Sequence, residues 1–389
     1  MHRLLIFLVP IVYTGAMKLT IAVQLQPTAP QSAALLATLE RANAACNALS
    51  VVAWESSTFG QYALHRRAYH DAKTASGLTA QVIVRCIAKV ADAYKLDRRR
   101  RRTFRSRGSI AYDSRILRWY PTEVSIWTTA GRERIPFVCG ERERALLTHQ
   151  QGESDLVYRD GRWFLYTTVV VAEPSESVPT DVLGADFGIV NILVDSDGTT
   201  YSGSHLNALR HRHRRLRRRL QAKGTKSAKR LLRKRRRKER RFSIDVNHTI
   251  AKRLVATAQG TGRAIAIENL TGIRDRVSAP RQQRATLHSW AFSDLRAKVD
   301  YKARLAGVRV VAVDPRNTSR TCVVCGNCDK NNRPQRDSFL CTVCGFAAPA
   351  DHVAALNLRQ RGRAVVNQPH AGESATSAGT PASSAPRAE

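Results

Sequence analysis

Two pairs of cysteines near the C-terminal end have the spacing of metal ligands. Two residues separate Cys322 from Cys325 and Cys341 from Cys344, and fifteen residues lie between the pairs. This spacing is typical of a four-cysteine structural site, in which all four ligands of one Zn²⁺ come from the protein. A glycine follows the second cysteine of each pair, where a knuckle needs a backbone free of Cβ. Because Cys328 lacks such a glycine, Cys325 is the predicted partner of Cys322.

Three acidic residues in apolar surroundings accompany the cysteines. Asp186 lies in an apolar stretch, Glu268 ends the apolar run that starts at Arg263, and Asp351 opens a helical segment seven residues after Cys344. Alone, each would be read as a cap or an ion-pair partner, but in a ribonuclease-H-like α/β fold these elements meet at one end of the sheet. Clustered carboxylates stay ionised around hard cations such as Mg²⁺ or Mn²⁺. The predicted chemistry is metal-dependent hydrolysis of a phosphodiester by Asp186, Glu268 and Asp351.

The charge of the chain favours a polyanionic partner. The 389 residues carry a formal net charge of +33, and the pI is near 10.9. Nucleic acid is the expected partner of such a field. The alternative partner, an anionic membrane surface, would need a long amphipathic apolar face beside the charge. The sequence shows no such face, so no membrane partner is expected. Thiols at metal-ligand spacing suit a reducing compartment, which predicts a cytoplasmic, nucleoid-associated protein.

The first sixteen residues allow two interpretations. A basic start, the apolar run from Leu4 to Val12 and small residues after it have the outline of a signal peptide, too short to span a membrane. The alternative, which we favour, is that residues 1–16 are not part of the native protein. The first domain then starts at Met17 with a strand over residues 18–25.

Residues 17–180 read as a β domain interrupted by helices. Apolar residues recur at helical spacing from Leu35 to Leu49 and from Val82 to Ala93. Residues 123–127 and 163–172 are rich in β-branched and aromatic side chains, which predicts strands. Residues 173–179, with a proline at each end, predict a linker.

A second domain is predicted over residues 181–363. Strands are expected within 183–194, at 199–201, at 263–269 and at 307–314, with helices at 290–305 and 351–361. A basic helical insertion is expected over about 205–258, broken near Gly224 and packed through recurrent leucines while its arginines grip phosphates. The cysteine module spans 318–347. Residues 364–389 are rich in Ala, Ser, Pro and Gly, which predicts a disordered tail.

The order of these motifs resembles the TnpB family, the transposon-encoded RNA-guided nucleases related to type V CRISPR effectors. The resemblance runs from about Met17 to Gln368. It rests on Gln26-Pro27-Thr28, Gly184-Ala185-Asp186-Phe187-Gly188, residues 241–248, Ile267-Glu268-Asn269-Leu270, Trp290-Ala291-Phe292, residues 301–308, residues 314–319 before Cys322, and residues 351–357.

The resemblance implies the following roles. Asp186, Glu268 and Asp351 match the RuvC-type catalytic acids of the family, and the four cysteines match its zinc ligands. The first domain matches a β-barrel wedge domain with a helical recognition insertion. The implied partners are a guide RNA from the transposon end and double-stranded target DNA cut beside a short adjacent motif; the sequence names no protein partner. Members usually carry Asn two residues after the third acid, where this chain has Val353.

Three alternative functions stay open at the level of sequence. A guide-directed regulator with an inactive nuclease would bind without cutting. A transposase would break and join element ends by itself. A zinc-ribbon nucleic-acid-binding protein without catalysis would leave the order of the carboxylates unexplained.

Overall fold

A computed structural model of the protein describes residues 13–269 and 292–368. The described residues form two compact units, an N-terminal unit of Thr14–Ala172 and a C-terminal unit that begins at Glu173. Each unit has a hydrophobic core of its own. No helix among the described residues is long and apolar enough to cross a membrane.

The N-terminal unit contains a seven-stranded sheet in the order β2-β6-β7-β1-β5-β4-β3. The two edge strands, β2 and β3, are separated by only four residues of chain, so the edges of the sheet approach each other as in a nearly closed barrel. The strands are β1 (Tyr13–Leu25), β2 (Ile110–Tyr112), β3 (Leu117–Trp119), β4 (Glu123–Thr128), β5 (Gly131–Val138), β6 (Gln150–Arg159) and β7 (Arg162–Pro174).

Strand β1 starts at Tyr13, not at residue 18 as predicted, so residues 13–16 of the predicted leader are part of the strand. Tyr and Thr, which occupy positions 13 and 14, favour extended backbone, and Met17 is buried within the same strand. The other residues of the predicted leader, 1–12, lie outside the described part of the chain.

The helices of this unit are α1 (Ala29–Glu55), α2 (Gln61–Ser76), α3 (Ala80–Leu96) and α4 (Glu141–Leu147). Thr28 begins α1 with a capping box: its Oγ1 accepts from the Gln31 N–H at 3.4 Å, and Gln31 Oε1 accepts from the Thr28 N–H at 3.0 Å. The predicted helical segments lie within α1 and α3. We did not predict α2, because it buries only Leu64 and Ala68 and so has no apolar stripe.

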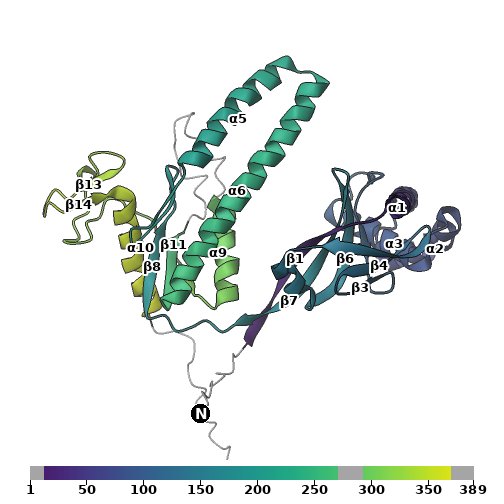
Figure 1. The fold of residues 1–389 in the computed structure, drawn as a ribbon, viewed down its shortest axis with the longest axis horizontal. Helices are drawn as coiled ribbons and strands as arrows, with labels where there is room; N and C mark the ends of the chain where they lie inside the picture. Colours follow the sequence, from purple (N-terminus) through teal and green to yellow (C-terminus); the bar gives the residue numbers. More distant parts are fainter. Residues whose placement is uncertain (1–12, 270–291, 369–389) are drawn as a thin grey trace, which may run out of the picture. The chain divides into compact units, whose positions relative to one another are not determined.

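The C-terminal unit contains a five-stranded mixed sheet in the order β10-β9-β8-β11-β12 (Figure 1). β8, β11 and β12 run parallel, while β9 runs antiparallel to β8 and to β10. The strands are β8 (Asp181–Asp186), β9 (Asn191–Asp195), β10 (Thr200–Ser202), β11 (Arg263–Glu268) and β12 (Val310–Val313). The helices are α5 (Ser204–Lys223), α6 (Lys226–Gly260), α9 (Phe292–Ala306) and α10 (Ala350–Val366).

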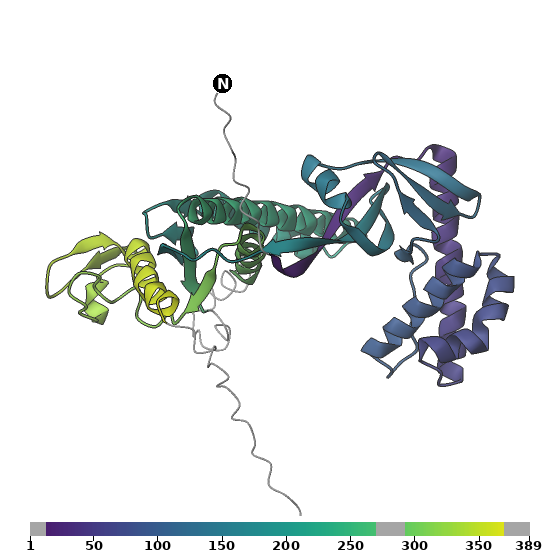
Figure 2. The same cartoon turned by 90° about the horizontal axis from the view of Figure 1, so that it is seen from below.

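Alternation along the strands assigns the two faces of this sheet. Ile265 and Ile267 of β11 pack in the core formed with α6 and α9. Ala264 and Ala266 pack in the core formed with α10 on the other face. The sheet is therefore the middle of three layers, with α6 and α9 on one side and α10 on the other (Figure 2).

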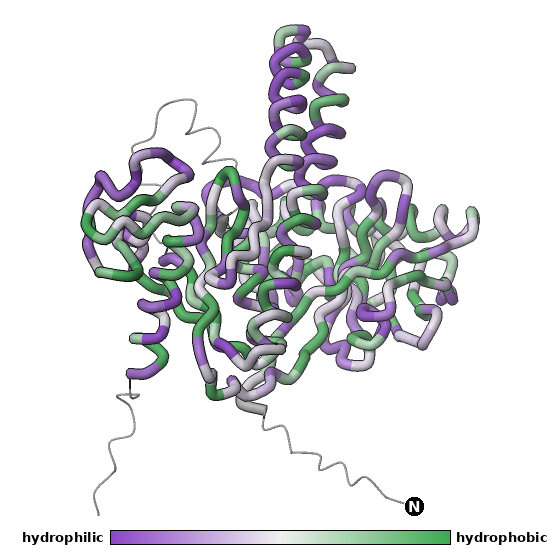
Figure 3. The backbone as a smooth tube through the Cα atoms, turned by 60° about the vertical axis from the view of Figure 1, so that its left-hand side comes forward, coloured by the Kyte–Doolittle hydropathy of each residue, from purple (hydrophilic) through white to green (hydrophobic). Residues whose placement is uncertain are grey.

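Helices α5 and α6 form a hairpin whose hydrophilic far half is evident in Figure 3. Gly224 ends α5 in the left-handed conformation, with φ of 61°, and Thr225 Oγ1 caps α6 by accepting from the Ala228 N–H at 3.2 Å. The break predicted near Gly224 is confirmed. At the C-terminal end, α10 continues to Val366, three residues into the predicted tail, and residues 369–389 lie outside the described part.

Helix α10 packs closely on the sheet because a glycine of β8 faces the helix and a glycine of the helix faces the sheet. A Cβ at Gly184 of β8 would clash with the Ala355 carbonyl oxygen and lie 2.6 Å from the Arg359 nitrogen. A Cβ at Gly362 of α10 would lie 2.6 Å from the Ala266 Cβ. The short distance between β8 and α10 matters because each element carries one of the predicted catalytic acids.

We expect Gly184→Ala to destabilise the C-terminal unit by about 3 kcal/mol or more, because backbone atoms of α10 would have to move. Thermal unfolding of the purified variant measures this. Gly224→Ala is the control, because nothing lies within 4 Å of its Cβ position and only the positive φ is disfavoured. Equal losses for both variants would contradict the close packing.

Candidate active site and metal centre

Two of the predicted acids end neighbouring parallel strands. Asp186 is the last residue of β8 and Glu268 is the last residue of β11, and Ala185 lies opposite Ile267 in the register of the pair. Both acids follow the alternation that places Ala266 on the α10 side of the sheet. The pleat therefore directs both carboxylates to the face that α10 covers.

The third acid, Asp351, lies in the first turn of α10, where the helix dipole favours a negative charge. Its Oδ2 accepts a hydrogen bond of 3.0 Å from Asn191 Nδ2 at the start of β9. Asp186, Glu268 and Asp351 all line one cleft of about 640 Å³. The structure thus brings the three predicted acids to one edge of the sheet.

The electrostatics of this cleft suit a bound cation. Burial raises the pKa of Asp186 well above its usual range, and the neighbouring Glu268 and Asp351 raise it further. Burial also raises the pKa of Glu268, whose carboxyl group is hydrogen-bonded to that of Asp186. Arg333 acts in the opposite direction on Asp186 but does not outweigh these effects. Carboxyl groups that disfavour one another's ionisation in the absence of a cation are a fitting donor set for a hard divalent cation.

Several residues of the cleft carried no signal that we recognised in the sequence. Asn191 is a polar residue in an apolar stretch, and this contrast was the one signal in the sequence that could have identified it as a residue of the cleft. Arg333 and Arg336 line the cleft from the segment between the two cysteine pairs. His352 lines it next to Asp351, and its Nδ1 is buried without a hydrogen-bond partner in the described structure.

Val353, where the family usually has Asn, faces away from the acids. It is fully buried in a cluster with Cys322, Phe339, Cys341 and Ala350. Two residues along a helix turn the side chain by about 200°, so Asp351 and Val353 point in nearly opposite directions. The departure from the family pattern therefore belongs to the core of the cysteine module, not to the cleft.

The four predicted cysteine ligands converge. Their sulfurs all lie within 4.8 Å of one another, with Cys322 Sγ 3.6 Å from Cys344 Sγ and Cys325 Sγ 3.5 Å from Cys341 Sγ. Tetrahedral coordination at a Zn–S distance of about 2.3 Å places sulfurs roughly 3.8 Å apart, so the cage fits zinc. Cys328 is exposed and outside this group.

Backbone geometry supports these thiolates. Gly326 and Gly345 have φ of 76° and 72°, which turns the chain back under each pair. The Cys344 N–H donates to Cys341 Sγ at 3.5 Å. This contact is the largest of several hydrogen bonds that together lower the pKa of Cys341 to about 6. The module is completed by β13 (Ser338–Leu340), β14 (Ala347–Pro349) and a 3₁₀ turn at Lys330–Asn332.

Two family profiles match the chain. Residues 164–273 match the family described as OrfB_IS605, probable transposase. Residues 292–358 match the Cas12f1-like TNB domain. The first match covers Asp186 and Glu268, and the second covers Asp351 and the four cysteines.

Curated relatives match parts of the chain. The CRISPR-associated endodeoxyribonuclease Cas12f1 of Sulfoacidibacillus thermotolerans is 40% identical over 119 residues, which cover 30% of this chain and 26% of the relative. The TnpB-like protein MJ0751 of Methanocaldococcus jannaschii is 34% identical over 33% of this chain and 46% of its own length. The putative RNA-guided DNA endonuclease InsQ of Escherichia coli K12 is 26% identical over 53% and 55%. The chain thus spans about a quarter to a half of these relatives.

A solved structure shares the fold. The chain in the cryo-EM structure of a Cas12f1-sgRNA-target DNA complex is 16% identical, with a TM-score of 0.55 over 85% of this chain and 83% of that one. Together these comparisons confirm the resemblance predicted from the sequence: the chain is similar to probable transposases of the OrfB_IS605 type, to TnpB-like proteins and to Cas12f1 nucleases.

Proposed function

We propose that this protein is an RNA-guided DNA endonuclease of the TnpB type. The observation that carries the proposal is the convergence of Asp186, Glu268 and Asp351 in one cleft from β8, β11 and α10. Its relatives named as RNA-guided or CRISPR-associated nucleases support the same activity. In this proposal residues 17–180 form a wedge domain with a helical recognition insertion, and residues 181–363 form a ribonuclease-H-like RuvC domain with an inserted zinc ribbon.

The residues of the cleft have different roles in the proposed reaction. Two Mg²⁺ or Mn²⁺ ions held by the three acids would supply an activated water and stabilise the leaving oxygen of the phosphodiester. Asn191 holds the Asp351 carboxylate in one orientation through its 3.0 Å hydrogen bond. A guide RNA pairs with one DNA strand and supplies sequence specificity, while basic side chains hold the nucleic acids by their backbones.

The cysteine module has a structural role in this proposal. One Zn²⁺ bound by Cys322, Cys325, Cys341 and Cys344 would fix the chain segment that leads into α10 and so the position of Asp351. With a thiolate-bound zinc and a DNA substrate, the proposed enzyme would act in the reducing cytoplasm, in association with the nucleoid.

Plasmid cleavage tests the proposal. The protein is co-expressed with its native downstream flanking sequence, and the complex is incubated with Mg²⁺ and a plasmid library that carries a guide-matched target beside a randomised flank. Cutting that requires the matched guide supports the proposal. The flanks that are depleted from the uncut plasmids then reveal the adjacent motif. Binding without cutting would indicate a regulator, and joining of element ends without RNA would indicate a transposase.

Loss of the Asn191 hydrogen bond should lower the cleavage rate by about 10- to 100-fold, as is usual for residues that orient a metal ligand. We expect Asn191→Ala to raise the Mg²⁺ concentration needed for half-maximal rate, with target-DNA affinity unchanged. Cleavage titrated with Mg²⁺ measures both. Asn191→Asp is a second variant: it replaces the donor by a like charge and should be worse than Ala. Equal rates for Ala and wild type would rule out the orienting role.

A further inference from the structure

The acid cleft is longer than the cluster of acids. Its floor follows one row of residues across the sheet, because Asp186 of β8 lies opposite Val194 of β9, and Val194 lies opposite Thr200 of β10. All three residues line the cleft. Two strand spacings of about 4.8 Å each carry this row roughly 10 Å away from the acids. The cleft therefore has an arm over β9 and β10 that can receive the part of a bound strand next to the cut.

His352 lies beside this arm. It follows Asp351 in the first turn of α10, and a step of one residue turns its side chain by about 100° from that of Asp351. Its ring rests on the turn between β9 and β10, where Cε1 lies 3.8 Å from the position that a Cβ would have at Gly198. Gly198 has a φ of 88°, which residues with a side chain rarely adopt. The half-buried His352 and Gly198 both line the cleft.

The two nitrogens of the His352 ring differ in their surroundings. Nδ1 is buried and has no hydrogen-bond partner among the described residues. Nε2 has no partner in the described part of the chain either, but it is not buried, so it opens on the cleft. A buried position without an acceptor suits a lone pair better than an N–H group. In the neutral ring the proton therefore lies on Nε2, which makes His352 a hydrogen-bond donor toward a ligand in the cleft.

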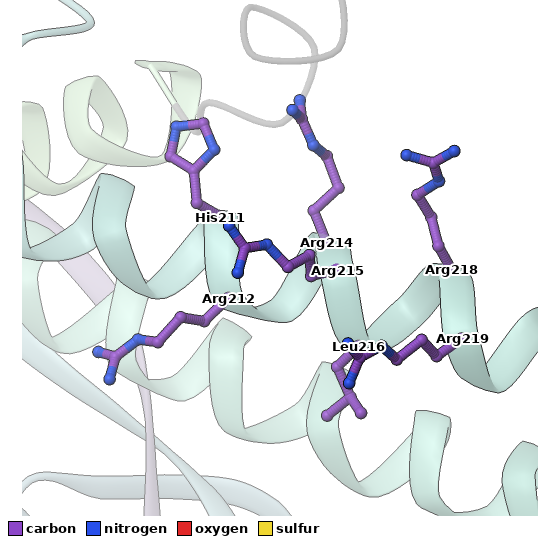
Figure 4. A pocket seen from close by; sticks show the side chains of 7 residues that line it. All are labelled: His211, Arg212, Arg214, Arg215, Leu216, Arg218 and Arg219. Atoms are coloured by element: carbon purple, nitrogen blue, oxygen red, sulfur yellow. The ribbon is translucent and has the colours of Figure 1, made fainter.

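His211 of α5 provides a comparison, because it also lines a hollow. That hollow has a volume of about 560 Å³ and is lined by His211, Leu216 and five arginines (Figure 4). None of these lining side chains is a carboxylate, and His211 itself is exposed. His211 is therefore a matched control for His352: a histidine that lines a hollow, but outside the acid cleft.

We propose that His352 contacts the DNA strand that the acids cut, and that its Nε2–H donates to a non-bridging oxygen of a phosphate next to the cut. The inference rests on the proposed function and adds to it a residue that binds the substrate without holding a cation. Base pairing with the guide lets the sequence at the cut vary from target to target. A contact that serves every target must therefore go to the backbone, because base edges differ among nucleotides.

Methylphosphonate substitution in the DNA tests this contact. The substitution replaces one non-bridging oxygen of a phosphate by a methyl group, and it is placed in turn at the phosphates on either side of the mapped cut in a guide-matched duplex. We expect one placement to slow cleavage by the wild type by about tenfold or more, as is usual for loss of a hydrogen bond to a charged group. In His352→Ala, the same placement should change the rate by less than about twofold, because the donor is already absent.

Two amide variants test which nitrogen donates. The side-chain nitrogen of Gln reaches the position of Nε2, whereas that of Asn reaches only the position of Nδ1. His352→Gln should therefore keep much of the cleavage rate and of the methylphosphonate effect, and His352→Asn should behave like His352→Ala. His211→Ala should show the same methylphosphonate effect as the wild type.

The Mg²⁺ dependence separates a contact with DNA from a role that acts through Asp351. A residue that holds Asp351 in place, such as Asn191, should raise the Mg²⁺ concentration needed for half-maximal rate when it is removed. His352→Ala should leave that concentration within about twofold of the wild-type value, because Nε2 contacts the strand and not a metal ligand.

Two results would overturn the inference. One is a methylphosphonate effect in His352→Ala that equals the wild-type effect at every placement, with folding established by circular dichroism. The other is a raised Mg²⁺ requirement, which would make His352 a positioning residue for Asp351. If His352→Ala does not fold, equal methylphosphonate effects in the Gln and Asn variants would overturn the inference instead.

Failure of the inference can be distinguished from failure of the proposed function. If the wild type cuts no guide-matched DNA, the proposed function fails and the role of His352 fails with it. If the wild type cuts such DNA and the methylphosphonate effect does not depend on His352, the inference alone fails.

Discussion

Asp186→Ala should lower the rate of guided DNA cleavage by about 10³-fold or more, while the affinity for guide RNA stays within about twofold of wild type. Asp186 is the most central of the three acids, since its pKa responds to burial, to Glu268 and to Asp351. Removing it deletes one of the three carboxylates that would hold the proposed cations. Single-turnover cleavage with saturating Mg²⁺ measures the loss, and binding of labelled RNA measures the retained function.

A second variant at this position separates chemistry from stability. Asp186→Asn keeps the shape but not the charge, so cleavage should be lost as with Ala. The folded-state pKa of Asp186 is raised, so the carboxyl stabilises the fold while it is protonated, and this contribution is lost as the pH rises through the folded pKa. In buffer without added Mg²⁺, the melting temperature of Asp186→Asn should therefore exceed that of wild type by more at pH 8 than at pH 5. No chelator is used, because it would also remove zinc.

The control is Asp92→Asn, which removes an exposed carboxylate of α3 that pairs with Lys95 at the surface. It should change neither cleavage nor the pH dependence of melting, since exposed pairs contribute little. If Asp186→Ala cleaved DNA at the wild-type rate, the acid cleft would not be the active site. Equal loss of RNA binding would instead indicate that the variant is misfolded.

The acids and cysteines could be predicted because their evidence is local. Both cysteine pairs have a fixed spacing, and each acid ends or opens an element whose apolar pattern is evident. The order of parallel strands then brings Asp186 and Glu268 to one edge without any further information. Asn191 reaches the same cleft from the first position of β9, and Arg333 reaches it from the loop after the 3₁₀ turn. No periodicity in the sequence indicates where these two side chains point.

The helices and strands that we did not predict also lack a recognisable apolar pattern in the sequence. Strand β5 carries charged residues and Pro136, and only Ile135 and Phe137 are buried in it, so its alternation is too short to recognise. Helix α2 buries two residues in sixteen. The nearly closed arrangement of the N-terminal sheet depends on pairing between distant strands, and in the sequence only the family resemblance pointed to it. Val353 is the reverse case: it was identified by its departure from a pattern, but only the packing shows that it faces the cysteine module.

Cys341→Ser should lower the zinc content from one ion per chain to nearly none and, through unfolding of the cysteine module, abolish cleavage. Binding of a structural zinc contributes on the order of 10 kcal/mol to the fold of a small module, and little else holds this one together. Its core consists of a few residues, among them Phe339 and Val353, and two of its buried members are ligands themselves. Elemental analysis of the purified protein measures the zinc content, and limited proteolysis shows whether the cysteine module is folded.

The loss of cleavage follows from the connection between the two sites. Ala350 and Val353 of α10 pack in the core of the module, on either side of Asp351 in sequence. When the module unfolds, the first turn of α10 loses that packing and Asp351 loses its fixed position opposite Asn191. In the proposed enzyme, a zinc bound by the four cysteines would therefore act on catalysis through the position of Asp351, without taking part in the chemistry.

Cys328→Ser is the matched control, because this thiol lies in the same module, three residues after Cys325, but outside the four-sulfur group. It should keep one zinc per chain, the wild-type proteolysis pattern and full cleavage. A Cys341→Ser protein that is folded, zinc-free and active would show that the module needs no metal. Loss of zinc from Cys328→Ser as well would show that the choice of Cys325 as the partner of Cys322 is wrong.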